Sequence, residues 1–216
     1  MRHDPYAHCP RLPEEGEIDP RSVFLEQAPD AQSAFRSTDP VELEIGPGRG
    51  WFTIERLQYA PSVRVLGVEV RRKWATIVDE RLKKRGLGTR GRVFADDIRL
   101  VLPRFVAQSL SVAYVHFPDP WWKKRHNKRL VVSQELLVEL SRVLLPGGEL
   151  LVQTDVFERA DEYERIVGES GLFLPIEHTA RVLDHPYGAR SPRERKAMEN
   201  GLPVARLRYK NVGAQP

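Results

Sequence analysis

The sequence predicts an α/β fold: a Rossmann-like, doubly wound, mostly parallel seven-stranded sheet with helices on both faces. Three observations lead to this prediction. Short apolar runs alternate with longer stretches in which apolar residues recur at helical spacing. Glycine or proline separates many of these segments. The 216 residues, 41% of them hydrophobic, suit a single domain with a buried core.

The first 39 residues differ from the rest of the chain. They hold five prolines and show no regular apolar period. We therefore expect a loosely ordered N-terminal arm over residues 1–39, which lacks the apolar stretch of a signal peptide. Residues 40–216 form the predicted domain, and no internal repeat occurs in it.

Strands and helices are expected to alternate along this domain. In its first half we expect strands over residues 41–45, 63–70 and 91–95, and helices over residues 51–59 and 72–84. In its second half we expect strands over residues 111–117, 149–154, 172–177 and 204–209, and helices over residues 134–144 and 156–170. Residues 146–148 (Pro-Gly-Gly) and Gly171 are read as the stop signals of the last two helices.

Composition narrows the possible function classes. The formal net charge of +4, from 34 basic and 30 acidic residues, hints at a polyanionic partner. No apolar run reaches 18 residues, so we expect no contact with a membrane. The single cysteine, Cys9, excludes an internal disulfide framework and a cysteine-based zinc site. A reducing, cytoplasmic location is the simplest expectation.

A glycine-rich turn follows the first predicted strand. Gly46, Gly48 and Gly50 let the backbone approach a ligand closely and leave helix N–H groups pointing at it. Their spacing is Gly-x-Gly-x-Gly, whereas a dinucleotide pyrophosphate normally needs Gly-x-Gly-x-x-Gly. Glu44 lies two residues before Gly46, which favours a cationic ligand over a phosphate.

Acids also follow the next two predicted strands. Glu69 ends the second strand, where a carboxylate can accept from both hydroxyls of an adenosine ribose. Asp96 and Asp97 end the third strand, where one of them could accept from an adenine amino group. S-adenosylmethionine carries a sulfonium, an ammonium, a ribose and an adenine, so acids at three strand ends favour it as cofactor. The alternative is an ordinary turn with acids present by chance.

A basic segment with two tryptophans follows the fourth predicted strand. Asp119 lies between two prolines and is expected to point into the ligand crevice at the carboxyl end of the sheet. Trp121 and Trp122, next to several cations, could stack a base while the cations hold its phosphates. The alternatives are a tryptophan packed in the core and a solvated basic surface. Residues 121–130 hold Lys123, Lys124, Arg125, Lys128 and Arg129 and no acid.

Three segments together resemble the bacterial tRNA (guanine-N7-)-methyltransferase family. They are residues 43–50 (Leu-Glu-Ile-Gly-x-Gly-x-Gly), residues 67–70 (Gly-Val-Glu-Val) and, most specifically, residues 117–129, which begin Phe-Pro-Asp-Pro-Trp. Residues 153–155 and 191–194 add to the likeness, which covers about residues 41–209. The resemblance implies transfer of a methyl group from S-adenosylmethionine to N7 of a guanine in the tRNA variable loop. S-adenosylhomocysteine would be the product.

The resemblance also implies roles for single residues. Asp119 is the implied catalytic residue. The implied cofactor-binding residues are Glu44, Gly46, Gly48, Glu69, Asp97 and Asp119. The implied substrate- and RNA-binding residues are Lys123, Arg125, His126, Asn127, Lys128, Arg129, Asp155, Ser191 and Glu194. No metal and no obligate protein partner are implied, and tRNA is the expected partner.

Two alternatives stay open at this stage. Ser191 and Glu194 also fit a plain helix N-cap with a proline in the first turn, instead of a segment that closes over the substrate. At the level of function, a methyltransferase of small molecules would leave the basic segment without a role. A non-catalytic RNA-binding domain would leave the acids at the strand ends without one.

Overall fold

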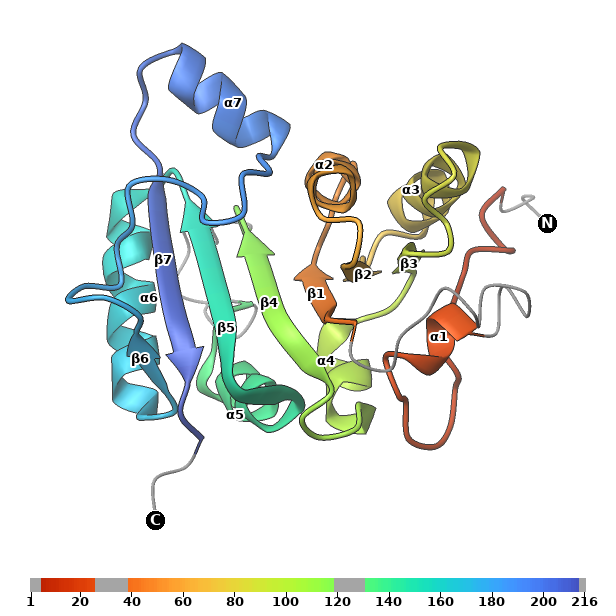
Figure 1. Cartoon of the computed structure of the whole chain (residues 1–216), viewed down its shortest axis with the longest axis horizontal. Helices are drawn as coiled ribbons and strands as arrows, with labels where there is room; N and C mark the ends of the chain where they lie inside the picture. Colours follow the sequence, from red (N-terminus) through yellow and green to blue (C-terminus); the bar gives the residue numbers. More distant parts are fainter. Residues whose placement is uncertain (1–4, 26–38, 119–130, 214–216) are drawn as a thin grey trace.

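Seven strands form one sheet in the order β3-β2-β1-β4-β5-β7-β6 (Figure 1). The computed structural model describes residues 5–25, 39–118 and 131–213. Five strands run parallel: β1 (Val41–Ile45), β2 (Arg64–Val68), β3 (Gly91–Phe94), β4 (Leu110–His116) and β5 (Leu144–Thr154). The last two, β7 (Ala205–Asn211) and β6 (Phe173–Pro175), pair antiparallel. The predicted mostly parallel seven-stranded sheet is therefore confirmed.

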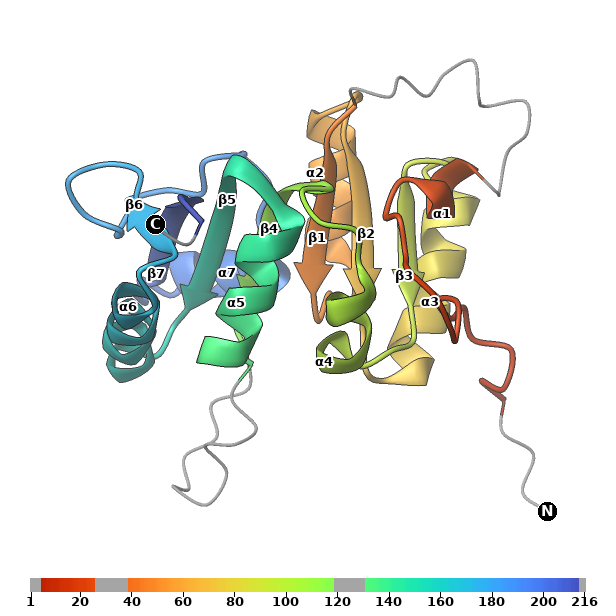
Figure 2. The ribbon, with the colours of Figure 1, turned by 90° about the horizontal axis from the view of Figure 1, so that it is seen from below.

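Helices cover both faces of this sheet, as predicted. The four expected ones are α2 (Trp51–Tyr59), α3 (Arg72–Lys84), α5 (Gln134–Val143) and α6 (Phe157–Ser170). The structure adds α1 (Ser22–Leu25), α4 (Ile98–Val101), the 3-10 helix η2 (Leu102–Arg104) and α7 (Pro192–Glu199). Figure 2 shows α4 and α5 on one side of the sheet and α2 on the other.

Alternate residues of each strand face the two helical layers, because successive side chains of a strand point to opposite sides. In β2, Val65 packs with Leu57 of α2 and Val78 of α3. Its neighbour Leu66 belongs instead to the larger core, together with Leu137 of α5. The sheet is thus buried on both faces, as a parallel sheet requires.

The junction of α5 and β5 differs from the expectation. The helix ends at Val143, and Leu144 already has an extended backbone (φ −74°, ψ 142°) that pairs with Leu110 of β4. The Pro-Gly-Gly sequence at 146–148 lies inside β5, where the pairing register with β4 shifts. Gly147 has φ 75°, a conformation that glycine adopts without steric cost. The glycines therefore form a bulge in the strand rather than the end of the helix.

Part of the N-terminal segment packs on the domain. Within residues 5–25, four side chains are buried in the main core: Leu12, Ile18, Val23 and Phe24. Ile18 forms a bridge with Phe105, and the Pro10 carbonyl accepts from Ala95 N at 2.7 Å. Apart from the short α1, this proline-containing segment has no helix within residues 5–25, yet these apolar side chains are buried. The division of the chain at residue 39 stays a prediction.

Candidate active site

The carboxyl ends of the five parallel strands meet at one edge of the sheet, where ligands bind in open α/β folds. Backbone hydrogen bonds continue the strands by one residue: Gly46 N donates to Val68 O, and Glu69 N to Phe94 O, both at 2.9 Å. The first residues of interest beyond the strands are Gly46, Glu69, Asp96, Phe117 and Asp155. The structure thus brings the ends of β1 to β5 together in the predicted place.

The glycine-rich turn leaves open space above its backbone. Gly46 and Gly48 have φ 69° and 55°, a left-handed conformation that favours glycine. A Cβ at Gly46 would have no neighbour within 4 Å, and one at Gly48 would meet only Gly46 O at 4.0 Å. At Gly50 a Cβ would instead lie 2.1 Å from Val78 Cγ1. The first two glycines therefore leave room beside the backbone, whereas the third lets α2 pack on α3.

Glu69 fixes this turn from the end of the neighbouring strand. Its carboxylate is buried and accepts hydrogen bonds from Gly48 N and Arg71 N, each at 3.0 Å. Arg71 Nε also donates to it at 3.2 Å. An ionised carboxylate has about four lone-pair sites, so it can accept further bonds from ribose hydroxyls. An open glycine cradle beside a buried acid fits an adenosine-containing cofactor.

Glu44 lies beneath the turn and faces α2. Its carboxylate accepts a hydrogen bond from Thr53 Oγ1 and lies 3.4 Å from His116 Nδ1 of β4. His116 Nε2 is in turn 3.4 Å from His185 Nε2, in the segment that follows β6. Glu44 is only 2% exposed. It is therefore placed to support the turn and the end of β4 through buried polar contacts.

A second buried polar cluster, formed by Glu42, Arg56 and Tyr114, lies on the same face of the sheet. Glu42 precedes Glu44 by two residues in β1. Arg56 of α2 donates to both carboxylate oxygens of Glu42, at 2.9 and 2.7 Å, and Tyr114 donates to Glu42 at 2.9 Å. The Tyr187 ring lies under the Arg56 guanidinium, with 4.5 Å from Arg56 Cζ to the ring centroid. Burial raises the pKa of Glu42 and that of Tyr114.

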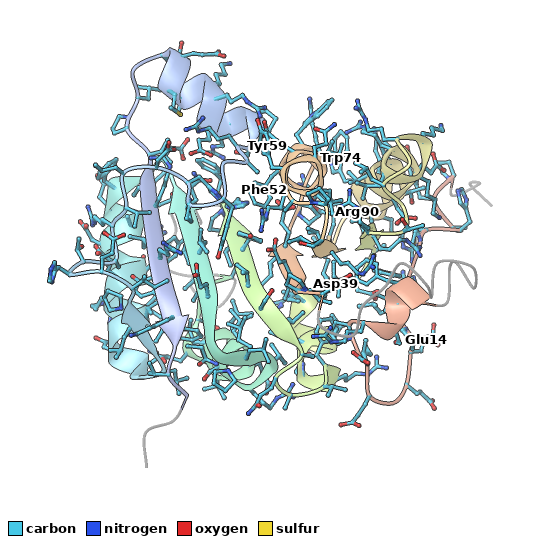
Figure 3. All side chains as sticks on the ribbon, viewed as in Figure 1. Glu14, Asp39, Phe52, Tyr59, Trp74 and Arg90 are labelled. Carbon is cyan, nitrogen blue, oxygen red and sulfur yellow. The ribbon has the colours of Figure 1, made fainter. Side chains whose placement is uncertain are left out.

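His185 closes this face of the sheet. Phe52 of α2, labelled in Figure 3, lies 4.8 Å from Tyr114 and 5.1 Å from His185 between ring centroids. Burial, the neighbouring His116 and the charges of nearby arginines lower the pKa of His185 to about 3. The imidazole is therefore neutral at physiological pH.

The two acids after β3 are both engaged. Asp97 caps α4 by accepting from Arg99 N at 3.0 Å, and it forms an ion pair with the Arg99 guanidinium, which lowers its pKa. Asp96 accepts from Leu12 N at 2.9 Å and lies 3.6 Å from Arg11 Nη1. The choice between them as adenine ligand, open in the sequence, stays open in the structure.

Phe117 turns the chain sharply at the end of β4. Its φ of 48° lies in the left-handed region, which is rare for a residue with a bulky side chain. Phe117 N still donates to Gln153 O at 2.7 Å, and the Arg193 guanidinium lies 5.2 Å from the Phe117 ring centroid. Phe117 therefore forms a strained turn at the end of β4, directly before Pro118.

The tail of the chain reaches this edge through α7 (Figure 1). Asp155, after β5, forms a bidentate ion pair with Arg193, in which both N–O distances are 2.8 Å. Ser191 accepts from Glu194 N at 3.2 Å, so the helix-cap interpretation is confirmed as geometry. Glu194 is fully buried, and its Oε1 accepts from Arg206 Nε at 2.7 Å.

Several predicted residues lie outside the described part of the chain. These are Asp119, Lys123, Arg125, His126, Asn127, Lys128 and Arg129. Among the predicted residues that are described, the structure joins Glu69 with Gly48, and it joins Asp155 with the helix that Ser191 begins. Glu44, Asp97 and Glu194 each contact other partners. Their roles as cofactor or substrate ligands stay predictions.

Sequence reasoning missed the buried polar layer under α2. One signal was present: polar side chains at alternate positions of two strands that otherwise read as apolar, Glu42 and Glu44 in β1, Tyr114 and His116 in β4. The partners Arg56 and His185 come from distant segments, so the pairings could not be read from the sequence.

Neither a membrane span nor a metal-binding cluster occurs within residues 5–25, 39–118 and 131–213. No helix there is long and apolar enough to cross a membrane. No group of three or more potential metal-ligating His, Cys, Asp or Glu side chains is present there.

Comparison with known proteins places the chain in a family. Residues 38–207 match the family described as "Putative methyltransferase". The tRNA (guanine-N(7)-)-methyltransferase of Myxococcus xanthus is 36% identical over 190 residues, which cover 86% of this chain and 90% of that protein. The protein of the same name from Anaeromyxobacter dehalogenans is 36% identical over 193 residues, 88% of this chain and 95% of that protein.

Solved structures share the fold at low identity. The aminoglycoside resistance methyltransferase NpmB1 has a TM-score of 0.52 at 18% identity, over 86% of this chain and 94% of that one. An S-adenosylmethionine-dependent O-methyltransferase from Thermotoga maritima has a TM-score of 0.53 at 15% identity, over 94% of this chain and 69% of that one. The fold is thus that of the S-adenosylmethionine-dependent methyltransferases, and the chain belongs to the tRNA (guanine-N(7)-)-methyltransferase family.

Proposed function

We propose that this chain transfers a methyl group from S-adenosylmethionine to N7 of a guanine in the variable loop of tRNA. The reaction takes place at the carboxyl ends of β1, β2, β4 and β5. The main observation behind the proposal is the hydrogen bond from Gly48 N to the buried Glu69 carboxylate. It lies in a turn that has open space at Gly46 and Gly48. Membership of the tRNA (guanine-N(7)-)-methyltransferase family supplies the substrate class.

The cofactor is held by the first half of the sheet. Gly46 and Gly48 permit its close approach, and Glu69 accepts from the two ribose hydroxyls while it keeps its bond to Gly48 N. Asp97 accepts from the adenine amino group, with Asp96 as the alternative ligand. Glu44 lies under the glycine turn and supplies negative charge near the ammonium and sulfonium groups.

Methylation of guanine N7 does not require a proton-transfer group. Guanine N7 has an in-plane lone pair and no proton, so no general base is needed to create the nucleophile. The bound cofactor supplies an activated methyl group. The protein must align N7 with that methyl group and stabilise the positive charge that develops on the purine ring. Asp119, as the catalytic residue, accepts from guanine N1–H and the N2 amino group, and its charge offsets the ring charge.

The second half of the site holds the RNA. Lys123, Arg125, His126, Asn127, Lys128 and Arg129 contact the tRNA around the target base, and Asp155, Ser191 and Glu194 lie on the side of α7. The Asp155–Arg193 ion pair fixes α7 at the mouth of the site. Glu194 acts through Arg206, because it is fully buried in the structure. The enzyme works in the cytoplasm without a metal or an obligate protein partner.

Methyl transfer to unmodified tRNA, followed by nucleoside analysis, tests the whole proposal. We expect 7-methylguanosine as the single new nucleoside, at a position in the variable loop. Asp119→Asn should lose most turnover while tRNA affinity stays near that of the wild type. Near-normal turnover of this variant would remove Asp119 from the catalytic role, and no methylation by the wild type would refute the function itself.

Cofactor binding is tested separately at Glu69. Glu69→Ala removes a buried acceptor, and each lost hydrogen bond to a charged group costs about 1.5–3 kcal/mol. Calorimetry should therefore show S-adenosylmethionine affinity reduced by at least tenfold. Glu177→Ala, which removes an exposed carboxylate in the segment after β6, is the matched control and should bind normally. Equal affinities in the two variants would refute the assignment of Glu69.

A further inference from the structure

The helix α3 and its flanks carry an excess of positive charge that the proposed site does not use. Residues 71–85 contain seven basic side chains and two acids, Asp79 and Glu80. Asp79 is buried, where Arg92 and Lys83 pair with it at 2.7 and 2.9 Å. Arg71 pairs with Glu69 at 3.2 Å, whereas Lys73, Lys84 and Arg85 are exposed to solvent.

Four cations of this region lie close to the rings of two tryptophans. The guanidinium carbons of Arg81 and Arg85 lie 5.1 and 5.6 Å from the ring centroid of Trp51, at the start of α2. Arg49 and Lys73 lie 5.2 and 5.7 Å from the ring of Trp74. Trp74, labelled in Figure 3, lies between α2 and α3 in that view. We call this set the α3 ladder: Arg49, Trp51, Lys73, Trp74, Arg81 and Arg85.

The ladder differs from the basic surface of α7. On and beside α7, each of three arginines pairs with a carboxylate: Arg190 with Asp184, Arg193 with Asp155 and Arg195 with Glu55. Within the described residues, the four cations of the ladder form no ion pair with a carboxylate. Their charge is therefore available to an anionic partner, whereas that of the α7 arginines is already neutralised.

The ladder adjoins the proposed cofactor site. Arg49 stands between Gly48 and Gly50 in the turn, and Arg81 Nη1 donates to the Arg49 carbonyl at 2.6 Å. Trp51, the first residue of α2, is 38% exposed. A chain of phosphates that crosses the ladder would therefore pass the mouth of the active site.

We propose that the α3 ladder is a second tRNA-binding surface, on which phosphates contact the cations and Trp51 offers its exposed ring to a base or ribose. This inference rests on the proposed function for its choice of RNA. The combination of flat aromatic rings with unpaired guanidinium groups is the chemistry that binds a nucleic-acid backbone with little sequence preference.

Salt-dependent binding of unmodified tRNA tests the inference. The variant Lys73→Ala/Arg85→Ala removes two ladder cations and leaves the glycine turn intact. The control Arg165→Ala/Lys210→Ala removes two exposed cations from α6 and β7, near the opposite edge of the sheet. In the ladder variant, the slope of log affinity against log salt should flatten by about 0.7–0.9 for each lost phosphate contact. The control should keep the wild-type slope.

Kinetics separate this surface from the catalytic site. In the ladder variant we expect KM for tRNA to rise about tenfold, while kcat at saturating tRNA and the affinity for S-adenosylmethionine stay within twofold of the wild type. Charge reversal, Lys73→Glu/Arg85→Glu, should enlarge the change in KM. Circular dichroism checks that both variants fold.

The outcomes are distinguishable. If slope and KM match the control while the wild type methylates tRNA, the ladder inference is wrong and the proposed function stands. If the wild type does not methylate tRNA, the proposed function fails, and tRNA binding by the ladder variant still decides whether the surface binds RNA. Competition by polyglutamate as strong as that by tRNA at equal charge would assign the surface to an acidic protein instead and overturn the inference.

Discussion

Strand β1 has two different faces. Val41, Leu43 and Ile45 belong to the large apolar core that also holds α4, α5 and α6. Glu42 and Glu44, which alternate with them, are each 2% exposed beneath α2. One strand therefore separates a predominantly apolar face from a face that contains buried carboxylates.

The difference between the two faces indicates which face of the sheet adjoins the candidate site. Apolar contacts stabilise the α5 face without orienting any polar group. On the α2 face, every carboxylate needs a partner, since a buried charge without one is very costly. Those partners come from α2 and β4, and His185, in the segment before α7, contacts His116 in turn. We therefore expect the polar contacts to fix the relative positions of the candidate site residues. The apolar contacts are expected to stabilise the domain as a whole.

The largest expected effect comes from breaking the polar face at Arg56. Arg56→Ala leaves Glu42 buried without its cation, and the free energy of unfolding should fall by about 3–5 kcal/mol. The triple variant Glu42→Leu/Arg56→Met/Tyr114→Phe removes the charges together and should be more stable than the single variant. Urea unfolding measures both. A triple variant less stable than Arg56→Ala would mean that the polar cluster is net stabilising.

The apolar face should respond to a single truncation by cavity formation alone. Leu137 of α5 is fully buried, and Leu137→Ala should lower the free energy of unfolding by about 3 kcal/mol. The affinity for S-adenosylmethionine should stay unchanged in this variant, because no polar contact of the site is lost. Calorimetry at a temperature where the variant is folded checks this, and a tenfold loss of affinity would show that the two faces are coupled.

Acid should weaken the polar face more than the apolar one. His185 is neutral when folded, with a pKa of about 3, and the unfolded chain binds a proton near pH 6.5. Stability is therefore lost as pH falls from 6.5 toward 3, and between pH 7.5 and 5 this group contributes a loss of about 2 kcal/mol. His185→Gln should lose that much less than the wild type over the same range. Urea unfolding measures the free energy of unfolding of both proteins against pH. If the two proteins show the same pH dependence, the lowered pKa of His185 is contradicted.

The smallest effect is expected at the cap of α7. Ser191→Ala removes the bond to Glu194 N and should cost about 1 kcal/mol, whereas Ser191→Asp keeps a capping oxygen and should cost less. If the serine only caps the helix, methylation by folded Ser191→Ala should match the wild type. A loss of turnover in both variants, out of proportion to stability, would show that the hydroxyl contacts the substrate.

The sequence by itself determined the sheet and predicted where the candidate site lies on it. Periodicity predicted all seven strands because each is a short run that must be buried on at least one face. The glycines at 46 and 48 and the acid at 69 predicted a cradle at the ends of β1 and β2, since backbone geometry and strand-end position are local properties. The family resemblance of residues 41–209 gave the reaction, which no periodicity could.

Only the tertiary structure decided the partners of the polar residues. Glu42 meets Arg56 across 14 positions, His116 meets His185 across 69, and Arg206 meets Glu194 across the turn from α7 to β7. The sequence predicted a cofactor-binding role for Glu44 and a substrate-binding or helix-cap role for Glu194, but not that each is buried against another element. A buried charge is tolerated only where folding brings a partner to it, and that partner is set by the packing of whole helices on the sheet.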